Sequence, residues 1–541
     1  MKKFFAFLIM LCGTLTAQNL DSLYSEFLRV KGIYDPTRIT VQSEDTEPVK
    51  CGTSLVNNIK LNFNNFTAKQ KSVLTPLLQR PATDTSFVTP SGKFRIHFDK
   101  SGYSIPGYDL KEFAKAADSS YNYEVNILKY PAPPADYGSG GDDLYDIYLK
   151  NLAGDEYGST YPEQELGGDK FTSFVIMDND FSGSSYSTNG IAAARVTIAH
   201  ELHHAIQMGN YIYRLADRFY HEATSTAMEE FVFDDVNDYY AYINHKYFDN
   251  PSKQITAYEG YGHAILNIFL RDRLGISVIK EIWEAMPKMR AVEAFSTVLA
   301  RHNTSLKVEF NLFGLWCYFT GNRYVPGNYF EEAANYPLIK TAMSVDFVKP
   351  TTTLKIYTSP ITNNFYEFID GNNRLFSIIS NVDVQSSVNS PSTSILLDYS
   401  ISSTASSGFR KLANNYYSKI SASDLTLLAE TNILNNAPLN PNQVSVETSS
   451  YPYPQPFKYS EHQYLYLPAS LNGGSTADLY VYTPDMSLVY SGQKRIVATE
   501  KIALLWDAKD SNQNKLATGV YFYIVKSGDD TIKGKFVIYN D

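Results

Sequence analysis

The segment at residues 199–207 constrains this chain more than any other. It contains the pattern H-E-x-x-H at His200, Glu201 and His204. Positions four apart lie on the same side of an α-helix, so two imidazoles at this spacing can bind one metal ion. A glutamate directly after the first histidine lies beside such an ion, where it can accept a proton from bound water. The pattern therefore predicts a metal site on a helix, and zinc suits these donors.

The residues around this pattern indicate a helix that packs on one side. Its apolar stripe, at helical spacing, consists of Ile198, Leu202, Ala205 and Ile206. A turn of about 100° per residue puts His200 and His204 on the other side, which we expect to face a cleft. His203 competes as a ligand, but the glutamate fits the register that ends at His204. We therefore expect His203 to flank the site; a solvated helix face is the alternative for all three histidines.

Length and composition narrow the class of protein. A chain of 541 residues corresponds to about three or four domains. Its net charge of −10 argues against nucleic acid as a partner. Residues 1–17 combine a basic start, a short apolar run and a small-residue cleavage site, which predicts a secretory signal. No later run is long enough to span a bilayer, so we expect a secreted or cell-surface protein without a transmembrane segment.

Two cysteines, Cys51 and Cys317, follow the predicted signal. They could pair outside the cell, although two cysteines do not make a disulfide framework. Cys51, in the sequence Lys50-Cys51-Gly52, could instead cap the zinc in a latent precursor, since a thiolate is a good zinc ligand. Nothing in the sequence places it there, so an unpaired or structural thiol is the preferred interpretation.

The pattern of apolar residues divides the chain into segments. Residues 18–90 are polar and form an N-terminal extension or propeptide. Residues 91–340 predict an α+β domain, in which a mixed-sheet lobe precedes a helical lobe and a cleft follows the metal helix. We expect strands at 93–98, 144–152 and 171–177, and helices at 67–78, 110–128, 215–233, 236–248, 261–274, 278–285, 291–300 and 309–319.

The pattern of apolar and turn-forming residues changes near residue 346. Short alternating runs separated by Ser, Asn, Pro and Gly predict a β-sandwich domain at 346–434. Residues 435–457 contain five prolines and predict a linker. A last β-module at 458–541 has expected strands near 463–467, 477–482, 501–506 and 520–525.

A third zinc ligand is needed, since a catalytic zinc keeps three protein ligands and one open position. Glu222 is the best candidate, because the chain between it and His204 allows a loop and an antiparallel return. Ala223, its small neighbour, would let the second helix approach the first. The rivals are His221, Asp217, Glu229 and Glu230. Glu229 lies seven residues after Glu222 on the same helix face, where it could hydrogen-bond a ligand histidine as a second-shell residue.

This arrangement resembles the gluzincin zinc peptidases, the class of thermolysin. The resemblance implies that His200, His204 and Glu222 are metal ligands and that Glu201 is the general base. Gluzincins also use a tyrosine or histidine from the helical lobe to stabilise the oxyanion. Tyr261 and His263 are the candidates here, and an aromatic packing residue and a surface histidine are the alternatives.

Further resemblances cover most of the remaining chain. Residues 91–337 resemble a family of secreted bacterial metallopeptidases; the matching pieces are 92–98 (GKFRIHF), 141–146 (GDDLYD), the metal helix and 222–230. The last module resembles the Ig-like module of flagellar hook-capping proteins and the related sorting domains of the type IX secretion system. Its matching pieces are 453–457 (YPQPF), 506–510 (WDAKD), 516–521 (LATGVY) and 534–536 (GKF).

Two acidic clusters are candidates for calcium, because clustered oxygen ligands suit that ion. One consists of Asp142, Asp143 and Asp146, and the other of Asp178, Asn179 and Asp180. Neither has EF-hand spacing, and solvated acidic loops are the alternative.

The combined expectation is a secreted zinc metalloendopeptidase, with a zincin-like domain followed by two β-sandwich or Ig-like modules. Its partners would be a protein or peptide substrate and, through the last module, secretion machinery or the cell surface. The alternative is a cell-surface adhesin or glycan-binding protein whose zincin domain is inactive.

Overall fold

The computed structural model describes residues 20–33, 50–152, 156–243, 246–346, 348, 351–370, 373–382, 384, 395–404, 408–419, 429–435, 451–460, 462, 464–470, 476–498, 502–528 and 530–540. The predicted signal at 1–17 and most of the predicted linker, residues 436–450, lie outside this part. The chain divides into two compact units, Met1–Ala241 with Glu259–Asn267, and Tyr242–Tyr258 with Ile268–Asp541.

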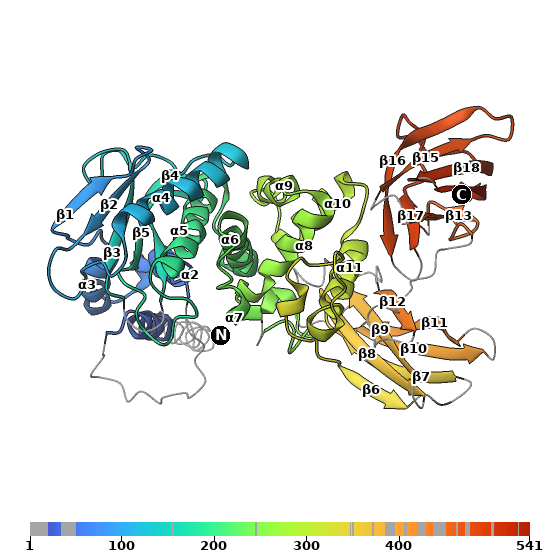
Figure 1. Ribbon diagram of the computed structural model, residues 1–541, viewed down its shortest axis with the longest axis horizontal. Helices are drawn as coiled ribbons and strands as arrows, with labels where there is room; N and C mark the ends of the chain where they lie inside the picture. The colour runs from blue at the N-terminus through green and yellow to red at the C-terminus, as the bar shows by residue number, and fades with distance from the viewer. Residues whose placement is uncertain are drawn as a thin grey trace, which may run out of the picture. The chain divides into compact units, whose positions relative to one another are not determined.

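A five-stranded mixed sheet forms the centre of the first unit (Figure 1). Its strands, in spatial order, are β1 (Thr85–Val88), β2 (Phe94–Phe98), β3 (Tyr145–Lys150), β5 (Lys170–Asp178) and β4 (Gly158–Gly167). The three central strands are parallel, and the two edge strands run antiparallel to their neighbours. The strands predicted at 93–98, 144–152 and 171–177 correspond to β2, β3 and β5.

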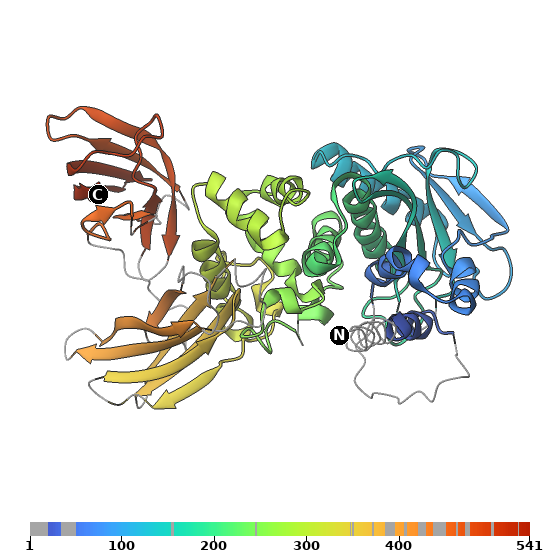
Figure 2. The ribbon, with the colours of Figure 1, turned by 180° about the vertical axis from the view of Figure 1, so that it is seen from behind.

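Both faces of this sheet are covered by helices, which is why most residues of its central strands are buried. α4 (Leu110–Tyr121) and α5 (Gly190–Ile206) contact one another and the sheet. The other face carries Tyr148, Phe174 and Ile176, which form a core with residues of the N-terminal helices. Those helices are residues 20–30, α2 (Thr53–Leu61) and α3 (Ala68–Leu77), drawn in blue in Figure 2.

Local sequence explains where several helices begin. Asp109 precedes α4 and accepts hydrogen bonds from the main-chain N–H of Lys111 and Glu112. Thr67 and Gln70 form a capping box at the start of α3. The helix expected at 110–128 is α4 followed by a π-helical turn, Asn122–Ile127.

α6 (Arg218–Val232) returns along α5 and contacts it. The segment Glu259–Asn267 contributes a 3₁₀ turn, Tyr261–His263, which contacts α6. The prediction of a helix at 236–248 is wrong, because in this stretch only Tyr240–Ile243 (α7) is helical among the described residues. Asp238 there binds Tyr157 and Thr188 with its side chain, and turns continue through the described residues that follow α7.

The second unit contains helices and sheets. α8 (Ala264–Leu274) begins in the first unit; α9 (Ser277–Ala285), α10 (Ala291–Arg301) and α11 (Leu306–Tyr318) follow. α11 packs on a four-stranded sheet of order β12-β9-β8-β6, and Asn311 donates to the Ile378 main-chain oxygen at 3.3 Å and to Ser380 Oγ at 2.8 Å. These strands are β6 (Met343–Asp346), β8 (Thr362–Asp370), β9 (Asn373–Asn381) and β12 (Ala429–Asn435). β7 (Thr351–Thr358), β10 (Ile395–Thr404) and β11 (Gly408–Lys419) form a three-stranded sheet.

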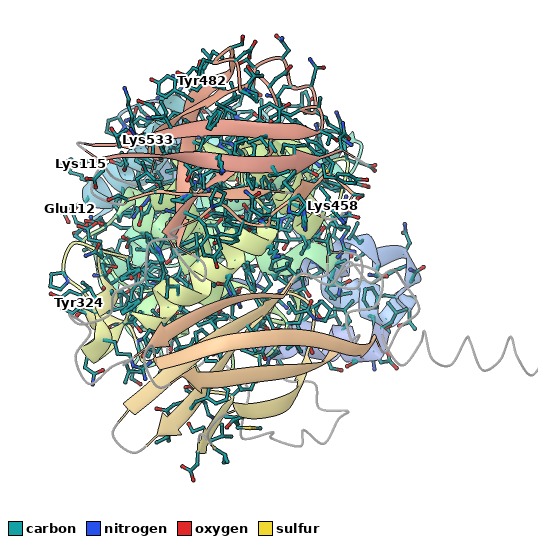
Figure 3. All side chains as sticks on the ribbon, turned by 90° about the vertical axis from the view of Figure 1, so that its right-hand side faces the viewer. Glu112, Lys115, Tyr324, Lys458, Tyr482 and Lys533 are labelled. Atoms are coloured by element: carbon teal, nitrogen blue, oxygen red, sulfur yellow. The ribbon has the colours of Figure 1, made fainter. Side chains whose placement is uncertain are left out.

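The last part of the chain forms a seven-stranded sheet (Figure 3). Its order is β13 (Phe457–Lys458), β19 (Asp530–Tyr539), β18 (Gly519–Ser527), β15 (Thr476–Tyr482), β16 (Leu488–Ala498), β17 (Ile502–Trp506) and β14 (Leu465–Pro468). Side chains in β15 alternate between buried and exposed, and Trp506 lies in the core. The fold is therefore mixed α+β with several sheets. Among the described residues, no helix is long and apolar enough to cross a membrane.

Candidate metal centre

Two helices bring three donor atoms together inside the first unit. α5 carries His200 and His204 one turn apart, and their Nε2 atoms are 3.1 Å apart. α6 carries Glu222, whose Oε2 lies 3.3 Å from His200 Nε2 and 3.2 Å from His204 Nε2. All three side chains are buried, with exposed fractions of 0–1%.

Small and polar residues let the two helices approach. Ala223 and Ala227 on α6 are fully buried, and α6 is in close contact with α5. Gln207, at the end of α5, donates from Nε2 to the main-chain oxygen of His221 and to Ser225 Oγ, both at 3.1 Å. The position that sequence reasoning favoured for the third ligand thus lies next to the histidine pair.

The outer nitrogens of both histidines are hydrogen-bonded to acceptors. His200 Nδ1 lies 2.8 Å from Glu229 Oε1, and His204 Nδ1 lies 2.9 Å from Gln207 Oε1. Because Gln207 uses its amide nitrogen elsewhere, Oε1 accepts, and both imidazoles carry their proton on Nδ1. The Nε2 atoms therefore converge with a carboxylate oxygen. Such a cluster of acceptors is stable only with a cation or extra protons between them.

The spacing of these donors fits a tetrahedral metal site. Zinc bonds of about 2.0–2.1 Å to nitrogen and oxygen give edges of about 3.4 Å between tetrahedral ligands. The observed separations of 3.1, 3.2 and 3.3 Å are close to that value. Two imidazoles and one carboxylate suit zinc and other divalent transition metals.

The carboxylates and histidines of the site change one another's pKa values. Burial lowers the pKa of His200, but hydrogen bonds to Glu222 and Glu229 and the surrounding carboxylates outweigh it and raise the pKa to about 9. Burial raises the pKa of Glu222, but the neighbouring charge of His204 and hydrogen bonds from both histidines hold it well below its usual range. The carboxylate is therefore ionised, as a metal ligand must be.

Glu201 lies beside the cluster with its carboxylate fixed in place. Its Oε2 accepts hydrogen bonds from Thr160 Oγ1 at 2.7 Å and from Thr53 Oγ1 at 3.1 Å. Its side chain is buried, with an exposed fraction of 1%. Gly158, on the neighbouring edge strand, lies close to α5, because an added Cβ would lie 3.1 Å from Thr197 Cγ2 and 3.2 Å from the Ile176 main-chain oxygen.

The two candidate oxyanion donors occupy different surroundings. The ring of Tyr261 lies 6.2 Å from that of His200, and its hydroxyl donates to the Cys51 main-chain oxygen at 3.2 Å. Burial, together with Glu222 and Cys51, raises the pKa of Tyr261 well above its usual value, so the hydroxyl keeps its proton. His263 is buried two residues later, but it is not one of the donors in the cluster.

Cys51 is the fourth member of the cluster. Its sulfur and one ligand atom each of His200, His204 and Glu222 all lie within 4.8 Å of one another, and the cysteine is 1% exposed. Cys51 and Cys317 are free thiols, so the alternative that they form a disulfide is wrong. Burial beside Glu201 and Glu222 raises the pKa of the Cys51 thiol well above its usual value.

Residues 50–54 close the site, which differs from the expected open cleft. α5 is buried on all sides from Val196 to Ile206, including the face that carries the histidines. The apolar stripe correctly marks one packed face, but the other face is covered by a segment about 150 positions earlier in the chain. The contact between Thr53 and Glu201 spans 148 positions.

The other predicted candidates are engaged elsewhere. His203 Nδ1 binds Glu124 at 2.8 Å, and burial lowers its pKa well below the usual value. His221 Nδ1 binds Gln207 at 3.0 Å, and Asp217 pairs with Arg214 at 2.9 Å. Glu230 is buried but is not one of the clustered donors.

The acidic loops are engaged in ion pairs and main-chain hydrogen bonds. Asp142 pairs with Arg95, and Asp146 pairs with Arg80 and His97. Asp178 accepts from the main-chain N–H of Leu152, Asp180 and Phe181. In the described part of the chain, the cluster at Cys51 is the group of His, Cys, Asp and Glu donors brought close enough to hold an ion.

Several residues of the site were not found from the sequence. Lys50 binds Glu229 and Asp238, Ser54 Oγ donates to Glu222 Oε1 at 2.9 Å, and Thr160 binds Glu201. The sequence Lys-Cys-Gly at 50–52 was the single indication that this segment contacts the site, and nothing in it predicts that it lies near the histidines in the fold.

Comparisons with known proteins add little to this description. No family model and no curated protein matches the chain. Among solved structures that match is PorZ, an essential bacterial surface component of the type IX secretion system of Porphyromonas gingivalis. It is 10% identical over 32% of this chain and 39% of that chain, with a TM-score of 0.13. A score this low does not establish a shared fold.

Proposed function

We propose that this chain is a secreted zinc-dependent metalloendopeptidase. The proposal depends on one observation, the convergence of His200, His204 and Glu222 at separations of 3.1–3.3 Å beside Glu201. The donor set and the hydrogen bonds to both outer nitrogens support this proposal. The resemblance to gluzincins supports the same assignment.

The residues then take distinct roles. When bound, zinc supplies a positive charge that polarises a carbonyl and lowers the pKa of a water molecule. Glu201, held by Thr160, accepts a proton from the attacking water and passes it to the leaving amine. Glu229 orients His200 through Nδ1. Tyr261 is the better oxyanion donor, because its hydroxyl already donates to a peptide carbonyl beside the cluster, that of Cys51.

Secretion and export rest on sequence alone. The predicted signal at 1–17 supports secretion, and the resemblance of the last module to type IX sorting domains supports export or retention at the cell surface. We infer a protein or peptide substrate because the site resembles those of peptidases.

Replacement of the base tests the proposal. Glu201→Gln should lower hydrolysis of unfolded casein by about 10²–10⁴-fold, the usual contribution of a general base. Bound zinc, measured by elemental analysis, should be unchanged. Glu124→Gln is the matched control, since Glu124 is a buried glutamate that binds His203 outside the cluster.

These activities are measured in a Cys51→Ser background, because the Cys51 sulfur lies beside the proposed metal ligands. Glu222→Ala in that background should lose zinc as well as activity. Zinc binding without hydrolysis of any unfolded substrate in the Cys51→Ser background would contradict the peptidase proposal and favour the inactive-domain alternative.

A further inference from the structure

The strand edge next to the metal centre is occupied by the chain itself. Cys51 pairs in parallel with Gly158 at the start of the edge strand β4. The Gly52 N–H donates to the Gly158 oxygen at 3.1 Å, and the Tyr157 N–H donates to the Lys50 oxygen at 2.9 Å. An exposed strand edge is a common binding place for an extended peptide. Residues 50–52 therefore lie where an extended substrate would bind.

Three side chains of residues 50–54 contact different groups of the site. Lys50 Nζ lies 2.6 Å from Glu229 Oε2, which in turn holds His200. Thr53 Oγ1 donates to Glu201 at 3.1 Å, and Ser54 Oγ donates to Glu222 at 2.9 Å. The proposed base, the proposed third ligand and the second-shell carboxylate are all engaged by residues 50–54.

Gly52 shows how closely the segment is seated. A Cβ at this position would lie 2.4 Å from Ser159 Oγ and 2.5 Å from Glu156 Oε1. Side chains at these distances would have to move, so glycine allows the segment to lie directly on the edge strand. The Tyr261 hydroxyl also holds the main chain of Cys51. It accepts a hydrogen bond from the Cys51 N–H and donates one to the Cys51 oxygen, both at 3.2 Å.

We propose that residues 50–54 are a built-in inhibitory strap and that Cys51 Sγ is the fourth ligand of the metal. This inference rests on the proposed zinc site. A catalytic zinc keeps one position for water, and a thiolate in that position leaves none. With a zinc–sulfur bond of about 2.3 Å, the tetrahedral edge from sulfur to nitrogen is about 3.6 Å. The sulfur lies within 4.8 Å of the other donors, at most about 1.2 Å beyond that edge.

The strap holds the protein latent until residues 50–54 are displaced. Displacement removes the sulfur from the metal, releases Glu201 from Thr53 and frees the edge of β4 at once. Substrate binding and opening of the metal site are thereby coupled, because the same segment blocks both.

Cobalt spectroscopy of the full chain tests the sulfur ligand without relying on activity. Metal-free protein is loaded with equimolar Co²⁺, which reports a thiolate ligand by a near-ultraviolet charge-transfer band and any tetrahedral site by visible d–d bands. We expect both features in the wild type. Cys51→Ser should lose the charge-transfer band and keep the d–d bands, whereas Cys317→Ala, which removes the other buried thiol, should keep both.

The outcomes separate this inference from the proposed function. Visible bands without a charge-transfer band in the wild type would overturn the cysteine ligand and leave the zinc site standing. A charge-transfer band that persists in Cys51→Ser would overturn the cysteine ligand in the same way. Absence of all bands in the wild type and in Cys51→Ser would overturn the zinc site, and the sulfur ligand with it.

Activity tests the inhibitory role separately. Cys51→Ser should hydrolyse unfolded casein at least tenfold faster than the wild type at equal zinc content, because serine is a far weaker zinc ligand. Equal, measurable activity in the two proteins would overturn latency, even with the charge-transfer band present. If neither protein hydrolyses casein while the band is present, the peptidase proposal fails and, with it, the inhibitory role.

Discussion

Lys50 should control how tightly the strap is seated. Its side chain is 1% exposed and contacts two buried carboxylates, Glu229 at 2.6 Å and Asp238. Burial lowers the pKa of Lys50, but Asp238 and Glu229 outweigh it and raise the pKa well above its usual value. Lys50→Met keeps the length of the side chain and removes its charge, so two buried carboxylates lose their cation.

The size of the effect follows from these contacts. Removing one partner of a buried ion pair costs about 3–5 kcal/mol. The lower end applies, because Asp238 keeps hydrogen bonds from Tyr157 and Thr188, and Glu229 keeps that from His200. Undocking of residues 50–54 lets water solvate both carboxylates and recovers this energy. A cost of about 3 kcal/mol therefore raises the undocked population about 100-fold.

Thiol labelling measures that population. In chelator-treated Cys317→Ala protein, Cys51 is the remaining thiol of the chain after the predicted signal, and it reacts with a thiol reagent only when the strap is undocked. Labelling should be about 100-fold faster in Lys50→Met than in the parent. Lys71→Met is the control, since Lys71 is partly exposed and donates to the Asn64 main-chain oxygen.

Two results would refute this reasoning. A labelling rate for Lys50→Met within about threefold of the Lys71→Met rate would show that the buried pair does not hold the strap. Complete loss of the far-ultraviolet circular dichroism of helices would show that it supports the whole unit instead of local docking.

Three further predictions concern the site and its support. Glu229→Gln should weaken zinc binding about 10–100-fold in a chelator competition assay, because the carboxylate partner of His200 becomes a neutral amide. Burial lowers the pKa of His221 to about 3, below the usual 6.5, so the unfolded chain takes up a proton first as pH falls. Unfolding of the first unit can be identified as the thermal transition whose midpoint shifts when zinc is added. That midpoint should therefore fall steadily as the pH is lowered below 6.5, and it should fall less in a His221→Asn variant. Gly260→Ala should lower the midpoint of the same thermal transition and weaken zinc binding, because φ is 122° and an added Cβ would lie 2.1 Å from a main-chain oxygen of α6. Gly275→Ala is the control: its φ is 88° but the space around it is open, so it should lose stability through backbone strain alone, about 1–3 kcal/mol.

The metal helix and its partner were accessible from the sequence because their signals are local. The spacing of His200 and His204 and the apolar stripe predict α5, and the number of residues to Glu222 allows an antiparallel return. The alternating or apolar runs of β2, β3 and β5 are local as well, since each strand carries its own pattern of burial.

The edge strand β4 was missed because its sequence is typical of a loop. Gly158–Gly167 contains Pro162 and a polar stretch, and its second half is largely exposed. Proline is tolerated in an edge strand, where one side of the backbone has no partner strand. α2 was missed for a related reason, because Thr53–Leu61 contains two asparagines, and polar residues such as Asn57 are buried in it.

The cover over the histidines could not be predicted, since it depends on contacts between distant positions. Periodicity distinguishes an apolar helix face from a polar one, but it does not say what lies against the polar face. Here that face contacts a peptide segment whose polar side chains satisfy the polar groups of the site, as Thr53 does for Glu201. A polar residue far along the chain gives no periodic signal of such a role.

Complete burial of the donors also has a consequence for how fast a bound metal can exchange. With His200, His204 and Glu222 between 0% and 1% exposed, an ion held by them would be shielded from solvent while residues 50–54 are seated. Exchange of that ion would therefore require residues 50–54 to open. A metal bound at the proposed site would leave no faster than that segment opens, so it would be retained even in a medium that contains little metal.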